Sequence, residues 1–314
     1  ITTRLVGSEM CIRDRYKPRG LTSFDCVAKI RKLYHTRKVG HSGTLDPSVD
    51  GVLPICLGDA TKVVQFLVAS GKQYQGSITL GFATTTEDLD GDEIAREPIT
   101  KPFSSSEIDQ ALATMTGEIT QIPPMFSAVK VNGRRLYDYA RHGETVERPK
   151  RQITIERFEQ RQVATYNAEQ QTQTIYFTVA CSKGTYVRTL AVDVGKQLGV
   201  PAVMSDLTRL KSGGFTLDET VTFEQIEAAV TAGTEAELLA PIETALTAYP
   251  QVTLTDELWS HVKNGAWLLP EEGQQPNPDA NTIVAFTYQD RIKCLYSYRT
   301  DSQRYKPLKM FSVD

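Results

Sequence analysis

Near the start of the chain, hydrophobic residues recur at the spacing of an α-helix, with polar residues between them. Val27, Ile30 and Tyr34 recur at that spacing after Ser23, a residue type that caps helix N-termini, so a helix is predicted to begin there. Turn-forming residues crowd positions 40–51 and predict a loop. The apolar run VLPICL that follows predicts a short buried strand.

Farther along the chain the pattern alternates, which is typical of strands with one apolar face. Tyr74 lies on the apolar side of one such strand, and a second runs from 175 to 181. Ser104 and Glu107 form a capping box before a helical stripe. Another helical stripe begins at Val187, with Arg188 off the stripe at the junction between strand and helix, a place suited to a functional side chain.

These elements suggest two domains. Residues 16–249 mix helices and strands, whereas IVAFTY and IKCLYSY read as a hairpin, so a small, mostly β domain is expected at 250–314. Within the first domain, 121–152 is basic and aromatic with poor periodicity, which favours an RNA-facing insertion. Residues 1–15 show no period and no signal-peptide stretch, and we expect a non-native or disordered leader.

Composition narrows the class of protein. The 314 residues are 40% hydrophobic and 23% charged, ordinary values for a soluble globular protein, and no apolar run reaches membrane-spanning length. The five cysteines form no CxxC pair, and the four histidines show no metal-ligand spacing. Neither a disulfide framework nor a metal site is therefore expected, and a reducing cytoplasm fits best.

The charge is unevenly distributed around a net value of −3. Ten Lys/Arg and three Asp/Glu lie between Arg4 and Lys38, whereas nine acidic residues and no Lys or Arg lie between Ser212 and Val262. A basic face opposite an acidic one is compatible with nucleic-acid binding, although a single charge run is more often only a solvated surface.

The candidate chemistry centres on Asp46. An isolated Asp-Pro is usually a turn, but here it lies within GHSGTLDPSVDGVLPICLGDATK, which closely resembles the catalytic motif of the TruB family of pseudouridine synthases. Five further stretches resemble that family in its order: KPRGLTSFD, TTTEDLDG, IPPMFSAVKVNGRRLYDYAR, SKGTYVRTLAVDVG and LTRLKSGGF. Six ordered motifs make a chance match implausible.

The resemblance implies an α+β fold with a central, mostly antiparallel sheet and a PUA-like C-terminal domain. It implies isomerisation of uridine 55 in the TΨC loop of tRNA, without a cofactor, metal or obligate protein partner. The N1–C1′ bond breaks, the base rotates, and C5 joins C1′. The alternatives are a tRNA-folding chaperone that has lost the chemistry and a guide-RNA-dependent relative, which would need additional subunit interfaces.

The resemblance also assigns roles to single residues. Asp46 corresponds to the catalytic carboxylate, either as nucleophile or as proton acceptor. Arg188 corresponds to the arginine that pairs with it, and Asp88 to the acid that holds this arginine. Tyr74 corresponds to the tyrosine that stacks on the target base, although a core tyrosine on an alternating strand is the alternative.

The remaining candidates concern RNA and the pocket wall. His41 resembles a histidine that braces the RNA loop while the base is extruded, and Tyr186 and Leu207 resemble wall residues. Candidate phosphate contacts are Lys17, Arg19, Lys130, Arg134, Arg135 and Arg141. The family usually enters KPRG through an apolar strand, where this chain has SEMCIRDR.

Overall fold

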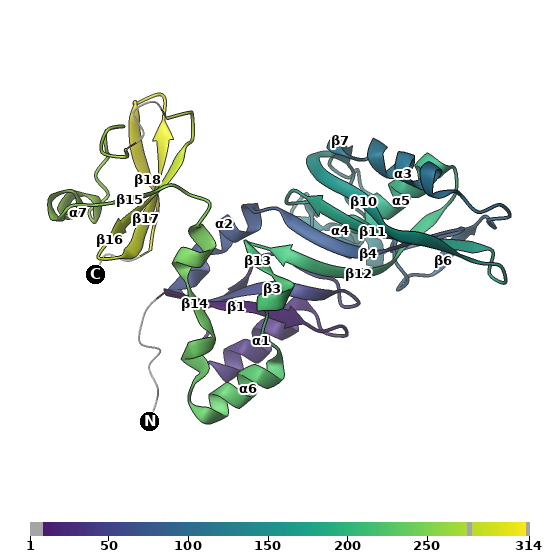
Figure 1. The fold of residues 1–314 in the computed structure, drawn as a ribbon, viewed down its shortest axis with the longest axis horizontal. Coiled ribbons are helices and arrows are strands. Elements are labelled where there is room, and N and C mark those ends of the chain that lie inside the picture. The colour runs from purple at the N-terminus through teal and green to yellow at the C-terminus, as the bar shows by residue number, and fades with distance from the viewer. Residues whose placement is uncertain (1–8, 275–277, 312–314) are drawn as a thin grey trace.

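A computed structural model describes residues 9–274 and 278–311 (Figure 1). Its α-helices are α1 (Ser23–Leu33), α2 (Val64–Ala69), α3 (Ser105–Thr114), α4 (Leu136–Arg141), α5 (Val187–Leu198), α6 (Phe223–Ala232) and α7 (Asp256–Val262). Short 3-10 helices are η1 (Asp59–Val63), η2 (Leu217–Glu219), η3 (Glu235–Leu238) and η4 (Ile242–Leu246). None of the helices in the described part of the chain is long and apolar enough to cross a membrane.

A ten-stranded sheet forms the body of the molecule. Its strands are β1 (Glu9–Lys17), β2 (Val39–His41), β3 (Asp50–Gly58), β4 (Lys72–Leu80), β7 (Gly117–Gln121), β10 (Arg151–Asn167), β11 (Thr172–Cys181), β12 (Ala202–Ser212), β13 (Phe215–Thr216) and β14 (Leu239–Pro241). The order is β14-β1-β3-β12-β4-β11-β10-β7, with β2 on β3 and β13 on β12. All neighbours are antiparallel except β12 and β3, which confirms the predicted mostly antiparallel α+β fold.

The main core lies where the helices pack on this sheet. It joins Val27 and Ile30 of α1 to Ile55 of β3, Ile78 of β4 and Leu190 of α5. Neighbouring β3 residues such as Val52 and Cys56 belong to a second cluster, as the alternation of a strand requires. Both faces of β3 are therefore buried, which explains why VLPICL is continuously apolar.

A smaller sheet occupies the C-terminal end (Figure 1). It is formed by β15 (Gln251–Thr253), β16 (Ile283–Tyr288), β17 (Arg291–Arg299) and β18 (Arg304–Met310), in this order. The predicted hairpin is confirmed as β16–β17. Ile292 and Leu295 pack in the same cluster as Phe66 of the large domain, so the two sheets share buried surface. The boundary near 250 and the PUA-like character stay predictions.

Two expectations about local structure are wrong. α1 is capped by Thr22, whose hydroxyl accepts from the Asp25 amide in a capping box, while the Ser23 side chain is buried. Residues 9–15 are not outside the fold, because β1 pairs with β3 and β14. Backbone hydrogen bonding to two neighbours places this segment in the sheet despite its weak alternation; residues 1–8 of the expected leader lie outside the described residues.

Candidate active site

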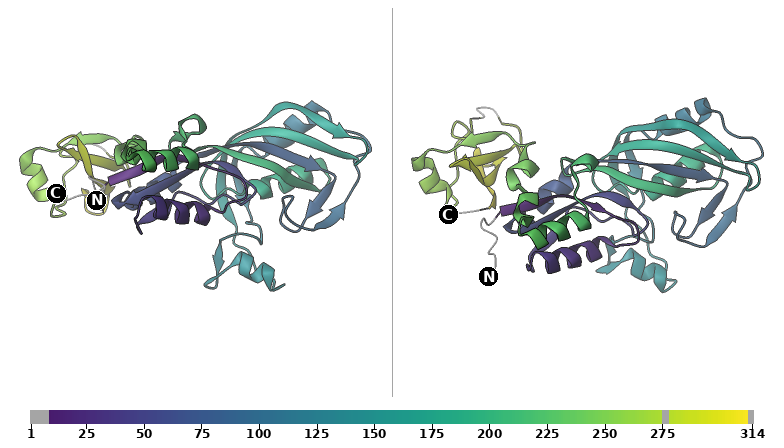
Figure 2. Two further views of the ribbon diagram at one scale, coloured as in Figure 1. Left: turned by 90° about the horizontal axis from the view of Figure 1, so that it is seen from below. Right: turned by 60° about the horizontal axis from the view of Figure 1, so that its bottom comes forward.

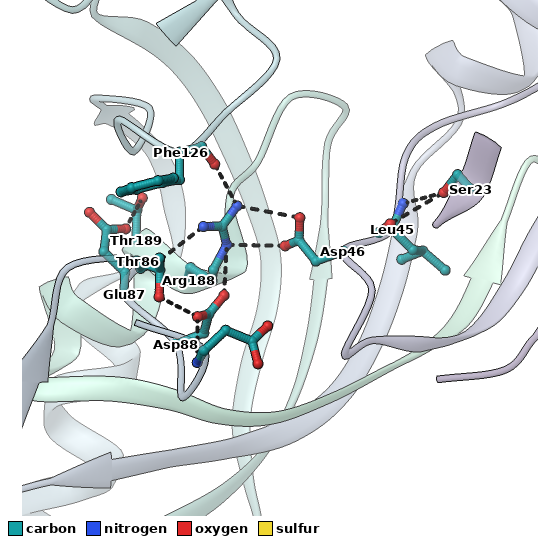
Figure 3. Close-up of polar contacts among 10 residues, drawn as sticks. Ser23, Leu45, Asp46, Thr86, Glu87, Asp88, Phe126, Arg188 and Thr189 are labelled. Carbon is teal, nitrogen blue, oxygen red and sulfur yellow. Dashed lines mark hydrogen bonds and ion pairs between the residues drawn. The ribbon is translucent and has the colours of Figure 1, made fainter. Parts of the chain in front are cut away.

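Asp46 lies on the loop between β2 and β3, and several side chains fix this loop. The Ser23 hydroxyl accepts from the Leu45 amide at 2.9 Å (Figure 3). The Lys17 ammonium donates to the Pro47 carbonyl at 3.3 Å and also to the Val49 carbonyl. The loop thus has anchors directly on both sides of Asp46.

The prediction that Lys17 contacts phosphate is wrong. Its side chain is fully buried, and its ammonium bonds to loop carbonyls. Burial lowers its pKa from the ordinary lysine value. A lysine enclosed in this way cannot reach an RNA backbone, so its contribution is to hold the loop that carries Asp46.

Arg188 joins Asp46 to Asp88 (Figure 3). Its Nε lies 3.1 Å from Asp46 Oδ2 and 3.6 Å from Asp88 Oδ2. The side chain of Arg188 is 8% exposed and that of Asp88 7%, whereas that of Asp46 is 39% exposed. The outer carboxylate is therefore the one that faces solvent, and the inner one is enclosed.

Backbone carbonyls complete the surroundings of this guanidinium. Its terminal nitrogens donate to the Thr86 carbonyl and the Phe126 carbonyl, both at 2.9 Å. Asp88 in turn accepts from the Thr86 hydroxyl and from the Asp90 amide. Arg188 is thus oriented from several sides, and the predicted grouping with Asp46 and Asp88 is present in the geometry.

The electrostatics of Asp46 reflect two opposing causes. Burial of the loop raises the pKa of this carboxyl above its ordinary value, and the nearby Arg188 guanidinium partly offsets that rise. Asp88 adds a smaller upward contribution through charge repulsion. The ion pair therefore counters a desolvation cost that would otherwise favour the protonated acid.

Tyr74 lies on β4, in register with Arg209 of β12. Its side chain is 6% exposed, and burial raises the pKa of its phenol. Leu207 is also buried and lies opposite Gly76, where a Cβ would be 2.2 Å from the Asp206 carbonyl oxygen. Only glycine allows the strands to approach so closely here, opposite Leu207 and two positions after Tyr74.

His41 ends β2 at the start of the loop that carries Asp46. Its Nδ1 accepts from the Gly43 amide at 3.3 Å. Burial and the positive charge of Arg209 lower its pKa, which favours the neutral imidazole at neutral pH. A neutral flat ring suits the predicted role of bracing a base.

Two other candidates, Tyr186 and Arg19, bond to neighbouring residues of the protein. The Tyr186 amide and carbonyl both bond to the Gln121 side chain, which fixes the start of α5. Arg19 forms ion pairs with Asp50 at 3.3 Å and Asp206 at 2.6 Å. Its side chain remains 48% exposed, so a phosphate would compete with these carboxylates.

The 121–152 segment carries the remaining basic candidates. Figure 2 shows it projecting from the sheet in both views, including the β8 (Lys130–Val131) and β9 (Arg134–Arg135) pair and α4. Lys130, Arg135 and Arg141 are exposed. One terminal nitrogen of Arg134 instead donates to both carboxylate oxygens of Glu144, at 3.0 and 2.8 Å, which braces the segment internally.

The sequence pattern does not identify Arg209, a fully buried cation behind the loop that carries Asp46. It donates to the Val52 carbonyl at 2.7 Å and the Gly43 carbonyl at 3.1 Å. Its place within LTRLKSGGF was the available signal, but an arginine on a strand is ordinarily expected to be exposed. The carbonyls of Thr86 and Phe126 carry no side-chain signal at all.

Comparisons with known proteins agree with this geometry. Residues 31–187 match the model of the TruB family pseudouridylate synthase N-terminal domain, and residues 188–247 match that of the tRNA pseudouridylate synthase B C-terminal domain. The chain is 78% identical to tRNA pseudouridine synthase B of Lactiplantibacillus plantarum, over 95% of this chain and 97% of the relative. It is 60% identical to the same enzyme of Levilactobacillus brevis, over 95% and 98%.

A solved Cbf5-Nop10-Gar1 complex has a chain with the same fold, at a TM-score of 0.71 and 26% identity. The alignment covers 97% of this chain and 85% of that one. The family models and these relatives identify the chain as a pseudouridine synthase, which is an isomerase. The chain belongs to the TruB family of these enzymes.

Proposed function

We propose that the chain isomerises uridine 55 in the TΨC loop of tRNA, with Asp46 as the catalytic group. The tRNA substrate is inferred from the names of the relatives, and the position from the resemblance of the motifs. The observation that carries the catalytic assignment is the 3.1 Å ion pair between Asp46 and the buried Arg188. This pair keeps a carboxylate at an accessible surface in one orientation.

The proposed reaction requires this carboxylate and a pocket that holds the extruded uridine. Asp46 either attacks the sugar or removes a proton from it, while the N1–C1′ bond breaks and the base turns to present C5. A proton leaves C5 and one is gained at N1, so the reaction is balanced without an oxidant or hydrolytic water. Tyr74 is a neutral phenol at pH 7, as an ordinary tyrosine with a pKa of about 10 is, and burial raises its pKa further, so its ring is available for stacking in the uncharged form.

The intact site favours this activity over a chaperone that has lost the chemistry. A protein that only bound tRNA would have no need to hold Arg188 with two carbonyls and two carboxylates. Maintaining a buried guanidinium has a desolvation cost that binding alone would not require.

A direct assay tests the proposal. The purified chain is incubated without other proteins with an unmodified tRNA transcript, and pseudouridine is mapped by carbodiimide treatment and primer extension. We expect modification at position 55 alone, none with a transcript carrying cytidine there, and none with Asp46→Asn. Modification at another position would contradict the assigned site, and turnover by Asp46→Asn would contradict the assigned residue.

A further inference from the structure

Lys72 begins β4 beside the catalytic loop, and none of the assigned roles uses it. A Cβ placed on Gly43 would lie 3.5 Å from Lys72 Cε and 3.8 Å from a terminal nitrogen of Arg209. The two cations therefore flank one point of the loop that carries Asp46. Gly43, with φ of +128°, presents no side chain between them.

The ammonium of Lys72 has little compensation within the protein. Its hydrogen-bond acceptor among the described residues is the Val68 carbonyl at 3.3 Å, which leaves donors unused. Within the described part of the chain, the fully buried Arg209 bonds to the Val52 and Gly43 carbonyl oxygens and forms no ion pair with a carboxylate. Positive charge thus accumulates behind the catalytic loop.

The other titratable groups around Lys72 do not neutralise this charge. Lys183, which is exposed, adds to it, and the Cys181 thiol stays protonated because burial raises its pKa to about 11. The Glu156 carboxylate has an oxygen 3.6 Å from a Cβ placed on Gly71, but among the described residues it forms no ion pair with Lys72. Burial, followed by the charge of Arg209, lowers the pKa of Lys72 to about 8. A bound anion would relieve this repulsion.

The position on the strand indicates which anion fits. Lys72 and Tyr74 point to the same face of β4, about 7 Å apart along the strand. One nucleotide can therefore place its base near the Tyr74 ring and a phosphate near the Lys72 ammonium. Extrusion rotates the target nucleotide about its backbone into the pocket, so the phosphates next to it pass close to the residues around that pocket.

We propose that Lys72 binds a backbone phosphate adjacent to the uridine that reacts, while the buried Arg209 adds positive potential at this point without contacting the RNA. The inference rests on the proposed function, since it requires RNA at this site. Lys72 acts here as a positioning residue, because it holds the nucleotide by its phosphate and does not touch the bonds that change.

The test asks whether removing the Lys72 charge and removing the charge of one RNA phosphate have effects on binding that depend on each other. Binding is measured in an Asp46→Asn background, so that the RNA stays unreacted, with tRNAs carrying one neutral methylphosphonate on either side of the target uridine. The nucleotide next to each methylphosphonate carries a 2′-O-methyl group, which prevents its hydroxyl from cleaving the RNA. The matched control RNAs carry the same 2′-O-methyl group and an ordinary phosphate. Lys72→Met is compared with Lys72→Arg and with Lys196→Met, which removes an exposed lysine paired with Asp193 on α5.

We expect one methylphosphonate to weaken binding roughly tenfold when Lys72 is present, as loss of a charge-assisted bond does. In Lys72→Met the same replacement should add nothing, and the slope of log Kd against log salt should decrease by about one. Lys72→Arg and Lys196→Met should keep the full effect. Thermal unfolding verifies folding, and Lys72→Gln replaces the methionine variant if the latter is unstable.

If a methylphosphonate weakened tRNA binding equally in the Asp46→Asn protein with Lys72 and in the one with Lys72→Met, the inference would be overturned. So would a slower reaction of Lys72→Met, tested with Asp46 present, without any change in this coupling, because that pattern indicates a role confined to the loop. Turnover of the unmodified transcript by the unaltered chain separates the two proposals. If pseudouridine forms while the coupling is absent, only the phosphate site is wrong.

Discussion

Arg188 and Asp46 lie 142 positions apart in the chain, yet the guanidinium reaches the carboxylate at 3.1 Å Nε–Oδ2. α5 places the arginine, and the loop before β3 places the aspartate. Since Arg188 is buried and also held by the Thr86 and Phe126 carbonyls, it is the fixed partner of the pair. The Asp46 carboxylate is thus oriented by a group that has little freedom to move.

Arg188→Met should cost both activity and stability. It leaves the enclosed Asp88 carboxylate and two carbonyls without their donor, and breaking such a buried pair typically costs about 3–5 kcal/mol of unfolding free energy. Denaturant unfolding measures this loss. Asp88→Asn with Arg188→Met should recover part of it, because the unpaired charge is then removed. A stable, active Arg188→Met variant would place the orienting group elsewhere.

The raised pKa of Asp46 gives a pH prediction of definite sign. An acid whose pKa is higher in the folded state favours folding when protonated, so its ionisation removes stability as pH rises through the folded pKa. Asp46→Asn should therefore melt at or above the wild-type Tm at pH 7, and this difference should shrink toward pH 4. Protonation of Asp46 also removes the charge that the reaction needs. As the pH is lowered, activity should therefore begin to fall at a pH higher than the ordinary aspartate pKa of about 3.9.

Calorimetry of both proteins between pH 4 and 8 provides the measurement. Asp193→Asn, which lies on α5 and pairs with Lys196, is a control for a general effect of losing a carboxylate. A lower Tm for Asp46→Asn at pH 7 that recovers in acid would mean that Arg188 outweighs burial and depresses the pKa of Asp46.

Much of the fold could be predicted because single strands and helices carry their own patterns. The strand around Tyr74, the helix after Ser104 and the β16–β17 hairpin are present as expected. β1 could not be predicted, because its pairing comes from backbone bonds to β3 and β14. A strand held by its neighbours needs no strong alternation of its own.

The site shows the same difference between what local sequence patterns predict and what depends on contacts between distant segments. The motifs identified Asp46, Asp88 and Arg188, which the structure brings together. The motifs did not show that Lys17 is buried, because a lysine in a turn-rich stretch ordinarily faces solvent. Only the tertiary structure reveals that loop carbonyls surround it.

Substitutions of Tyr74 should separate stacking from proton transfer. Tyr74→Phe keeps the ring, so RNA binding should be retained while turnover reports the contribution of the hydroxyl. Tyr74→Ala removes a buried ring and should lose turnover, about 3–5 kcal/mol of stability and roughly 1–3 kcal/mol of base stacking. Single-turnover rates and Kd values are compared with those of Phe177→Leu, a core change on β11. Full activity in Tyr74→Ala would make Tyr74 a core residue only.

Deletion of residues 1–15 tests whether β1 belongs to the catalytic sheet. The strand pairs with β3, which follows the Asp46 loop directly, so its loss should lower the Tm and slow turnover. Deletion of residues 1–8 leaves the described strand intact and serves as the control. Equal Tm values for the full chain and the chain without residues 1–15 would show that the pairing contributes no stability.

The projecting 121–152 segment should contribute to RNA affinity through its exposed cations. Arg135 and Arg141 both lie near the Tyr137 ring, at 5.6 and 5.2 Å from its centroid, and form a basic, aromatic surface. Replacing both with glutamine should reduce the slope of log Kd against log salt by about two, because each phosphate that the protein no longer neutralises keeps its counterion. Arg134→Gln is the matched control, since its guanidinium is engaged by Glu144, and it should change the slope little. Single-turnover rates at saturating RNA should stay near wild type in the double variant, because the Asp46–Arg188 pair is untouched. An unchanged slope in a folded double variant would place the RNA on another surface.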